Sequence, residues 1–544
     1  MLVTPHTGSL RGRMRPRAIG KLKRMTVVAA SASPAFWDRA PRARPSGRRV
    51  LVAAAVLALA GVGAMLRLRA LSAPYWIDEG ISVGLSSHPV GAIPGLLRQD
   101  GSPPLYYLLL HVWMALLGTA PSTTHALSAG LAIGCVPAAW WAVAPFGAWA
   151  GLVAGGLMAL DPFVGLYADE TRMYSLLLLI ALLVCGAFLR AFVLRRRAHL
   201  ASFAILLALG LYAHPWGAFL VGAAGLAWLA LLAVGPSRRT LARDGALAFG
   251  AAALLFAPWV PTMLYQAAHT GAPWSHRPTG RSLTRAMARI WSGRRAELLL
   301  LPAAAVGLVL GALRGGPRAR RAVLGVAVIA ATTLLAAFAY SRFGTPAWAL
   351  RYLVVVLAPL ALLVAMGLGR LALLGPLAVL AAALLVWHGR PTVATLEHKS
   401  NVTQVARELA PALRRGTLVF STQPEQVPEL AHELPAGLRY ATPLGRVPDA
   451  GVMDWRDALA RLDAARFAAV LGPQVRGLRR GARLLLVQPV FSHPDSPWTL
   501  KIRDIARRWG RAVRRSRLLR RLRTLRPTHG SSRSTVAAIL MERR

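Results

Sequence analysis

The sequence is poor in cysteine and in negative charge. Its 544 residues include only two cysteines, Cys135 and Cys185, so neither a disulfide framework nor a zinc site can be built on thiolates. Asp and Glu number 21 against 65 Lys and Arg, which gives a formal net charge of +44 at pH 7. No nucleic-acid-binding motif accompanies this surplus. We interpret it as attraction to anionic lipids and as orientation of membrane helices, and we expect no nucleic-acid partner.

Long hydrophobic runs dominate the middle of the chain. Hydrophobic residues make up 55% of the sequence, and the mean hydropathy is +0.47. Apolar runs recur from Val50 to Trp387, and each is close to the roughly 20 residues that a helix needs to cross the hydrocarbon layer. Lipid offers no hydrogen bonds to the backbone, so these runs must be helices. The sequence therefore predicts a polytopic α-helical membrane protein.

The distribution of basic loops predicts the topology of this membrane region. If segment 103–118 does not cross, the arginine-rich loops near residues 196, 238 and 320 all fall on the cytoplasmic side, as the positive-inside rule requires. We therefore predict about eleven crossings, with 103–118 as an interfacial or re-entrant helix. The N-terminus is then cytoplasmic and the C-terminus extracytoplasmic. The predicted crossings are 50–70, 125–143, 145–161, 173–194, 198–212, 215–234, 246–262, 296–313, 321–340, 351–368 and 372–388.

Two flanking regions differ from the apolar middle. Residues 1–49 are basic and predict a disordered cytoplasmic tail, ahead of a transmembrane domain over 50–390. Residues 391–544 alternate short β-like runs with helical patterns, which predicts a small extracytoplasmic α/β domain. The helical patterns are Val402–Leu413 and Trp455–Ala465; the strand-like runs are Thr417–Ser421, Phe467–Leu471, Arg483–Gln488 and Val536–Met541.

A basic amphipathic segment closes the C-terminal region. Apolar residues recur at helical spacing from Ile502 to Leu525 among many arginines. One interpretation is a helix that lies on an anionic membrane surface. The other is a basic helix that packs on its own domain, and the sequence does not choose between them.

Carboxylates are rare in the membrane region and cluster on its outer side. Asp-Glu pairs occur at Asp78-Glu79 and Asp169-Glu170, and the predicted topology brings both pairs to the same face. Interfacial helix caps would explain one such pair. Converging carboxylates also suit proton removal from a hydroxyl nucleophile, or the binding of a divalent cation. The acidic residues between positions 50 and 390 are Asp78, Glu79, Asp100, Asp161, Asp169, Glu170, Asp244 and Glu297.

At these residues the chain resembles a family. It is similar to the family 39-like glycosyltransferases, which are bacterial relatives of protein O-mannosyltransferases and of the lipid A aminoarabinose transferase in the C-type superfamily. The resemblance covers roughly residues 50–390. One departure is Ser102, because relatives often carry His or Lys just before the Pro-Pro. The matching motifs, in order, are Trp76–Glu79, Asp100–Tyr107, Tyr167–Tyr174 and Arg351–Leu353.

The resemblance implies a glycosyltransferase that takes a sugar, mannose-like or other, from a polyprenyl-phosphate carrier. Asp78, with Glu79 beside it, would be catalytic and would remove the proton of a hydroxyl acceptor in an inverting reaction. Asp169 and Glu170 would hold a divalent metal or position the donor phosphate, with Asp100 as a further substrate-binding residue. The implied location is the outer face of a bacterial cytoplasmic membrane. The acceptor, whether lipid, polysaccharide or protein, stays open.

Cationic and aromatic residues on the outer side complete the candidate site. Arg351 and Arg172 could bind the donor phosphate through bidentate hydrogen bonds, or could be interfacial and structural arginines. Tyr352 follows Arg351 as a further substrate-binding candidate. His214 could ligate a metal or contact phosphate, and is equally compatible with a structural role. The aromatic loop 263–295 could cover a sugar or acceptor site, or belong to an ordinary aromatic belt.

Two other classes of function compete with the enzyme. A transporter or lipid flippase predicts charges within the helices and inverted repeats, whereas here charge gathers in outer loops and no repeat is evident. A non-catalytic scaffold leaves the paired carboxylates unexplained. The sequence therefore favours the glycosyltransferase.

Overall fold

The structure is a computed structural model that describes residues 47–235, 237–389, 392–491, 494–527 and 533–544. The predicted N-terminal tail lies outside the described residues except for its last three positions, which begin the first helix. Residues 50–544 form one compact unit. The predicted domain boundary at 391 stays a prediction, because that unit contains both the helical bundle and the C-terminal sheet.

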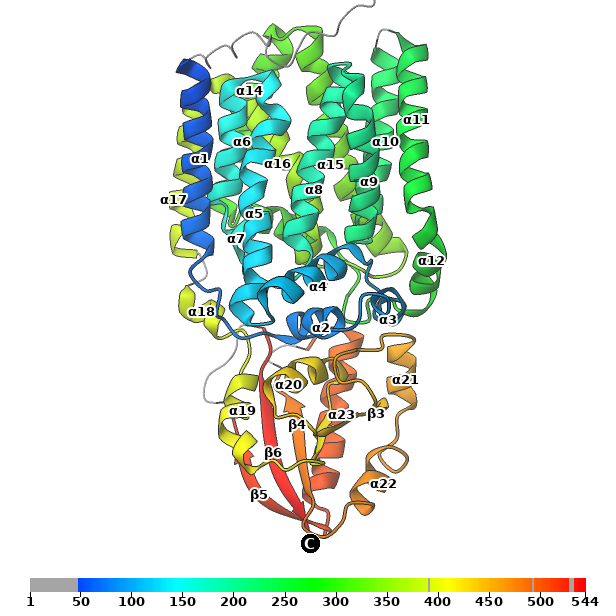
Figure 1. The fold of residues 1–544 in the computed structure, drawn as a ribbon. Helices are drawn as coiled ribbons and strands as arrows, with labels where there is room; N and C mark the ends of the chain where they lie inside the picture. Colours follow the sequence, from blue (N-terminus) through cyan, green and yellow to red (C-terminus); the bar gives the residue numbers. More distant parts are fainter. Residues whose placement is uncertain (1–46, 236, 390–391, 492–493, 528–532) are drawn as a thin grey trace, which may run out of the picture. The chain divides into compact units, whose positions relative to one another are not determined.

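A bundle of long apolar helices occupies the first part of this unit (Figure 1). In the described residues, eight helices are long and apolar enough to cross a membrane, or up to ten when two bent pairs are included. The eight are α1 (Gly47–Arg67), α5 (Pro121–Val143), α8 (Tyr174–Phe188), α10 (Gly217–Val234), α11 (Arg238–Phe256), α14 (Arg294–Arg314), α15 (Pro317–Phe343) and α16 (Val354–Leu368).

The bent pairs and one shorter helix account for the other predicted crossings. Helix α6 (Ala148–Leu160) and helix α7 (Pro162–Ala168) form one pair, bent by 55°, and α17 (Leu374–Leu385) begins the other. Helix α9 (Leu200–Ala213) is shorter and packs against α8 and α11. Each predicted crossing segment is therefore helical. A multi-pass membrane protein is confirmed, whereas the count of about eleven stays a prediction.

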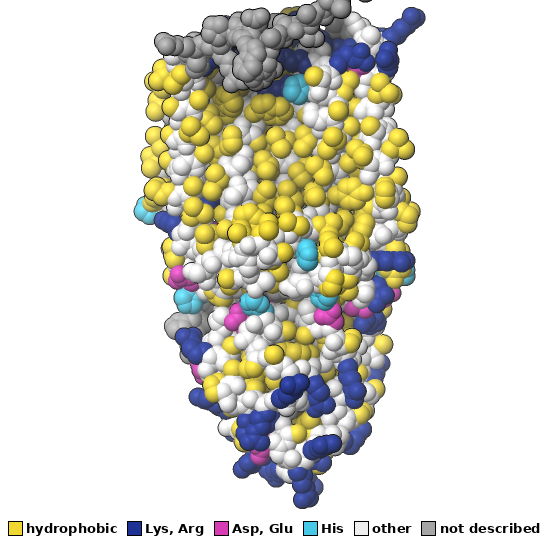
Figure 2. Space-filling view, viewed as in Figure 1, with side chains coloured by type: hydrophobic (Ala, Val, Ile, Leu, Met, Phe, Trp, Pro, Cys, Tyr) yellow, Lys and Arg dark blue, Asp and Glu magenta, His cyan; other side chains and the backbone are white. Residues whose placement is uncertain are grey.

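The outer surface of the bundle is apolar. Leu51, Leu254 and Leu313 are 72%, 77% and 72% exposed, and Figure 2 shows hydrophobic side chains over the flank of the bundle with Lys and Arg near its ends. A soluble protein rarely exposes so extended an apolar surface. Lipid is therefore the solvent that fits this surface.

Three short helices, α2 (Ile77–Ser86), α3 (Ile93–Asp100) and α4 (Leu105–Leu117), lie across one end of the bundle (Figure 1). Helix α4 is the segment for which we predicted no crossing. Its 13 residues span about 20 Å, less than the hydrocarbon thickness. This helix packs on α2 and α5 rather than running parallel to the crossings.

The C-terminal part contains a six-stranded sheet of order β3-β2-β1-β4-β6-β5. Strand β1 is parallel to β2 and β4, and β6 is antiparallel to β4 and β5. The predicted strands at 417, 483 and 536 are present, and β2, β3 and β5 were not predicted. The strands are β1 (Leu418–Ser421), β2 (Arg439–Thr442), β3 (Gly445–Val447), β4 (Arg483–Pro489), β5 (Leu519–Leu525) and β6 (Val536–Arg543).

The predicted strand Phe467–Leu471 is wrong. This segment is a turn that leads into helix α22 (Leu471–Arg476). Phe467, Val470 and Leu471 are spaced i, i+3, i+4, and alanine at both intervening positions has low β-propensity. Helical spacing therefore outweighed local hydrophobicity.

The other helices of this part are α18 (Val393–Glu397), α19 (Val402–Leu409), α20 (Val427–Glu433), α21 (Ala458–Ala464) and α23 (Pro497–Arg514). Helix α23 is the first half of the basic amphipathic segment. Its apolar residues Ile502, Ile505 and Trp509 are buried, and it packs on β4 and β5. The second half is strand β5. The apolar face is thus covered by its own domain and is not free to lie on a membrane.

Candidate active site

The neighbours Asp78 and Glu79 point in different directions because both lie in the first turn of α2. Consecutive residues of a helix are rotated by about 100°. The Glu79 carboxylate reaches back to the Trp76 backbone N–H at 3.2 Å and is completely buried. Asp78 instead faces a cavity.

The cavity has a volume of about 500 Å³ and lies between the bundle, the short helices and the C-terminal domain. This volume is typical of sites for small molecules. Most of the predicted site residues line it, although they come from five separate regions of the sequence. These residues are Asp78, Asp100, Arg172, His214, Arg351 and Tyr352.

Two guanidinium groups flank Asp78. Arg351 forms an ion pair with the Asp78 carboxylate at 3.4 Å, and Arg172 donates to the Asp78 carbonyl at 3.2 Å and to Ser82 Oγ at 3.0 Å. Among the described residues, Arg172 Nε and Arg351 Nε are buried without a hydrogen-bond partner, and Asp78 Oδ2 has the ion pair with Arg351 but no hydrogen bond. The two guanidinium groups offer cationic hydrogen-bond donors to the cavity, which suit an anionic ligand.

His214 presents a neutral ring to this cluster. The Trp216 backbone N–H donates to His214 Nδ1 at 3.0 Å, so the ring proton belongs on Nε2. Burial, with Arg172 and Arg351 nearby, lowers the pKa of His214 to about 3. The ring lies 4.5 Å from that of Tyr352. His214 is thus placed as a hydrogen-bond donor rather than as a cation.

Asp100 ends α3 at the edge of the cavity. Burial raises the pKa of Asp100, although hydrogen bonding with Ser102 lowers it. Tyr107 donates to Ser102 Oγ at 3.1 Å, so the Ser102 position carries a hydroxyl network where relatives often have a cation. Asp100 therefore belongs to the cavity, but within the described residues it has no cationic partner as close as the one that Arg351 gives to Asp78.

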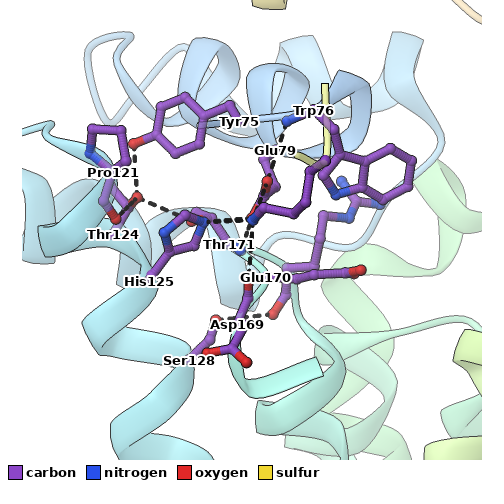
Figure 3. Close-up of polar contacts among 12 residues, drawn as sticks. Tyr75, Trp76, Glu79, Pro121, Thr124, His125, Ser128, Asp169, Glu170 and Thr171 are labelled. Carbon is purple, nitrogen blue, oxygen red and sulfur yellow. Dashed lines mark hydrogen bonds and ion pairs between the residues drawn. The ribbon is translucent and has the colours of Figure 1, made fainter. Parts of the chain in front are cut away.

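Glu79 belongs to a second, buried cluster at the junction with the C-terminal domain. Its carboxylate accepts from Lys399 Nζ at 2.8 and 2.9 Å, from His125 Nε2 at 2.6 Å and from the Thr171 backbone N–H at 2.8 Å (Figure 3). Burial alone would raise the pKa of Glu79, but Lys399 and His125 outweigh it and lower the pKa to about 2. We infer that Glu79 anchors α2 rather than contacting substrate.

Asp169 and Glu170 do not line the cavity. Glu170 pairs with Arg533 at 2.5 Å, and the Asp169 carbonyl accepts from Lys399 at 2.9 Å. Burial raises the pKa of Asp169 to about 7. Within the described residues, no three His, Cys, Asp or Glu side chains gather as metal ligands. This pair therefore does not fit the predicted metal site, and we derive no step through a metal.

Sequence reasoning missed three residues from the C-terminal region. Glu425 and Trp455 line the cavity, and Lys399 binds Glu79. Glu425 and Trp455 lie more than 300 positions from Asp78 and carry no local motif. Lys399 did carry a signal, because it is one of only four lysines in a chain whose cations are otherwise arginines.

Comparisons with known proteins find relatives of this chain by fold but not by sequence. No protein-family model and no curated protein matches the sequence. The solved structure of ArnT from Cupriavidus metallidurans bound to undecaprenyl phosphate aligns with 90% of this chain and 98% of its own, at 15% identity and a TM-score of 0.58. Arabinofuranosyltransferase AftD from Mycobacteria aligns with 91% of this chain and 40% of its own, at 16% identity and a TM-score of 0.54.

A third structure extends the likeness to archaea. The oligosaccharyltransferase AglB from Archaeoglobus fulgidus, in complex with an inhibitory peptide and a dolichol-phosphate, aligns with 81% of this chain and 70% of its own. Its identity is 12% and its TM-score 0.53. The chain therefore shares its fold with these three solved structures, and the fold that the resemblance predicted is confirmed.

Proposed function

We propose that the protein is an inverting glycosyltransferase that moves a sugar from a polyprenyl-phosphate carrier to a hydroxyl acceptor. The observation that carries this proposal is the arrangement of Asp78 between Arg351 and Arg172 in one cavity. The fold supports it, because two structures of this fold were solved with undecaprenyl phosphate or dolichol-phosphate bound. A flippase would not need a carboxylate that faces a cavity beside two arginines.

The cavity residues suit the two ends of such a reaction. Asp78 accepts the proton of the acceptor hydroxyl while the hydroxyl oxygen attacks the anomeric carbon. The bond between that carbon and the phosphate oxygen breaks, and the polyprenyl phosphate leaves with the bonding electron pair. Arg351 and Arg172 stabilise the negative charge that grows on the phosphate. Attack opposite the leaving phosphate inverts the anomeric configuration.

The proposed location of this reaction is the outer face of a bacterial cytoplasmic membrane. The arginine-rich loops and the cavity lie at opposite ends of the bundle, and the positive-inside rule places such loops in the cytoplasm. A periplasmic reporter fused in the Arg195–Arg197 loop should be inactive, and a cytoplasmic reporter there should be active. The reverse result would contradict the orientation.

A transfer assay in membranes tests the activity. Radiolabelled undecaprenyl-phosphate sugars are supplied to membranes that contain the wild type, Asp78→Asn or the control Asp244→Asn. Asp244 is a buried carboxylate that pairs with Arg197 at 3.0 Å, far from the cavity. Removing a general base typically slows a reaction by about 10²- to 10⁴-fold. We expect that loss for Asp78→Asn only.

Two outcomes would overturn the proposal. Wild-type transfer rates in a folded Asp78→Asn protein would remove Asp78 as the base. Transport of intact sugar-lipid without any sugar release would indicate a carrier instead.

A parallel assay with EDTA, followed by added Mg²⁺ or Mn²⁺, tests the predicted metal dependence.

A further inference from the structure

The C-terminal domain supplies one wall of the cavity. Glu425 lies in the short 3₁₀ turn Pro424–Gln426, which packs on α2, and Trp455 precedes α21. Trp274, from the loop between α12 (Val260–His269) and α13 (Gly280–Ile290), lies beside them. We call Glu425, Trp455 and Trp274 the domain wall.

Glu425 has one fixed and one free carboxylate oxygen. Its Oε1 accepts from Trp498 Nε1 and from Gln423 Nε2, both at 2.8 Å. Among the described residues, Oε2 is buried without a hydrogen-bond partner, and the residue is only 6% exposed. A buried unsatisfied carboxylate oxygen is costly. A ligand that donates a hydrogen bond would remove that cost.

The aromatic part of the domain wall is held in place by packing and by the backbone. The Trp455 ring lies 4.6 Å from Trp274 and 5.1 Å from Trp498. The Trp455 backbone N–H donates to the Gln99 carbonyl at 3.0 Å, which ties this segment to the bundle side. Trp274 Nε1 is a second buried polar atom without a partner among the described residues. The wall is therefore preorganised and offers an acceptor, a donor and aromatic rings.

The domain wall differs in charge from the cluster around Asp78. Arg351 and Arg172 favour a phosphate, whereas burial raises the pKa of Glu425, which has no ion-pair partner among the described residues and gives a phosphate no cation to bind. The donor phosphate therefore belongs beside the arginines, and the domain wall is left for a neutral group rich in hydroxyls. A sugar ring has this character, because its hydroxyls donate to carboxylates and its C–H face packs on indole rings.

We propose that the domain wall is the acceptor subsite and that the acceptor presents a sugar ring there, with a ring hydroxyl bound by Glu425 Oε2. This inference rests on the proposed function and adds the chemical class of the acceptor. Glu425 is a specificity-determining residue that binds the acceptor, while Asp78 takes the proton of the attacking hydroxyl.

The test compares acceptors and separates acceptor binding from donor chemistry. Labelled undecaprenyl-phosphate sugars are offered with octyl glycosides of pyranose and furanose sugars, or with Ser/Thr peptides. Donor hydrolysis without any acceptor is measured in parallel. We expect transfer to octyl glycosides, and an acceptor KM raised about 10-fold by Glu425→Gln, since a lost hydrogen bond at a buried site costs about this much. Donor hydrolysis should stay within about twofold of the wild type.

Matched variants keep the result interpretable. Asp504→Asn changes an exposed carboxylate of the same domain and should leave both readouts unchanged. Trp455→Phe keeps an aromatic ring and should raise the same KM to a smaller extent, which covers the case in which Glu425→Gln lowers the thermal midpoint. Transfer to peptides only, an unchanged acceptor KM, or an equal fall in donor hydrolysis would overturn the inference. Failure of the proposed function looks different, because the wild type would then release no sugar at all.

Discussion

Asp78 and Glu79 are neighbours in the sequence but belong to opposite kinds of site. The carboxylate of Glu79 is completely buried, and both of its oxygens are paired with donors. Asp78 faces a cavity, and within the described residues its carboxylate has one ion-pair partner, Arg351 at 3.4 Å, and its Oδ2 makes no closer hydrogen bond. A single helical step therefore separates an anchoring carboxylate from one that is available to a substrate.

The two clusters around these residues show that a buried charge can serve either stability or ligand binding. The junction cluster of Glu79, His125 and Lys399 satisfies its own charges, so we assign it to stability. The cavity cluster of Asp78, Arg172 and Arg351 retains unsatisfied atoms, which a native structure keeps where a ligand binds. Mutations that separate stability from activity test this distinction between the two clusters.

The largest expected effect on stability comes from Glu79→Gln. Removing the charge leaves the Lys399 ammonium buried without its counter-ion, and breaking a buried pair costs about 3–5 kcal/mol. We expect a large fall in the midpoint of thermal unfolding in detergent. Asp78→Asn should leave that midpoint close to the wild type while it slows transfer by about 10²- to 10⁴-fold. Equal thermal midpoints for Glu79→Gln and Asp78→Asn would contradict the different roles of these two carboxylates.

A double-mutant cycle gives the control for this result. Lys399→Met alone leaves the buried Glu79 carboxylate without its counter-ion, whereas Glu79→Gln with Lys399→Met removes both charges. The double variant should be less destabilised than the sum of the two single variants. Lys501→Met is the matched surface change, since Lys501 pairs with the more exposed Asp463 and such pairs contribute about 0–1 kcal/mol. Simple additivity in the cycle would contradict a coupled junction pair.

The cavity cluster should show the opposite pattern at Arg351. Arg351→Lys keeps the positive charge but loses bidentate binding of phosphate. We expect the KM for the polyprenyl-phosphate donor to rise about 10-fold, with the thermal midpoint changed little. Arg342→Lys, at an exposed position outside the cavity, is the control and should leave the donor KM unchanged. An unchanged donor KM in Arg351→Lys would exclude phosphate binding at this residue.

Local sequence patterns predicted much of this architecture for physical reasons. Each crossing must be a continuous apolar helix, so the crossing segments can be predicted from length and hydropathy alone. The charge rule also indicated that 103–118 does not cross, and α4 lies across the end of the bundle. The motif residues Asp78, Arg172 and Arg351 converge because each lies at an end of a helix or in a loop on one side of the bundle.

The features that the sequence did not predict depend mainly on contacts between residues far apart in the chain. Nothing near Glu425 indicates that its turn packs on α2, because that contact forms only when the sheet domain docks. The assignment of Asp169 and Glu170 to a metal site ignored Lys399 and Arg533, which approach from the same docked domain. The short strands β2 and β3 were missed because four and three residues are too few to show an alternating pattern.

The smallest expected effect concerns the pH dependence of the junction. Glu429 lies on α20, which packs on α2, and burial raises the pKa of Glu429 to about 8 although Ser400 and Gln426 lower it. A raised carboxyl pKa means that the folded state holds a proton that the unfolded state releases above about pH 4.3. The protonated Glu429 carboxyl therefore makes its full contribution to the free energy of unfolding below that pH, and this contribution is lost as the pH rises through 8.

Glu429→Gln should therefore flatten the alkaline part of the stability profile. Between pH 7 and pH 9 the wild type should lose about 1 kcal/mol more than the variant, because only the wild type must ionise a buried carboxyl. Thermal midpoints measured across this range check the difference, and Asp504→Asn, at an exposed position, should follow the wild type. The raised pKa of Asp169 is common to all three proteins and cancels in the comparison. Parallel profiles for the wild type and Glu429→Gln would show that the folded protein does not hold Glu429 in its protonated form.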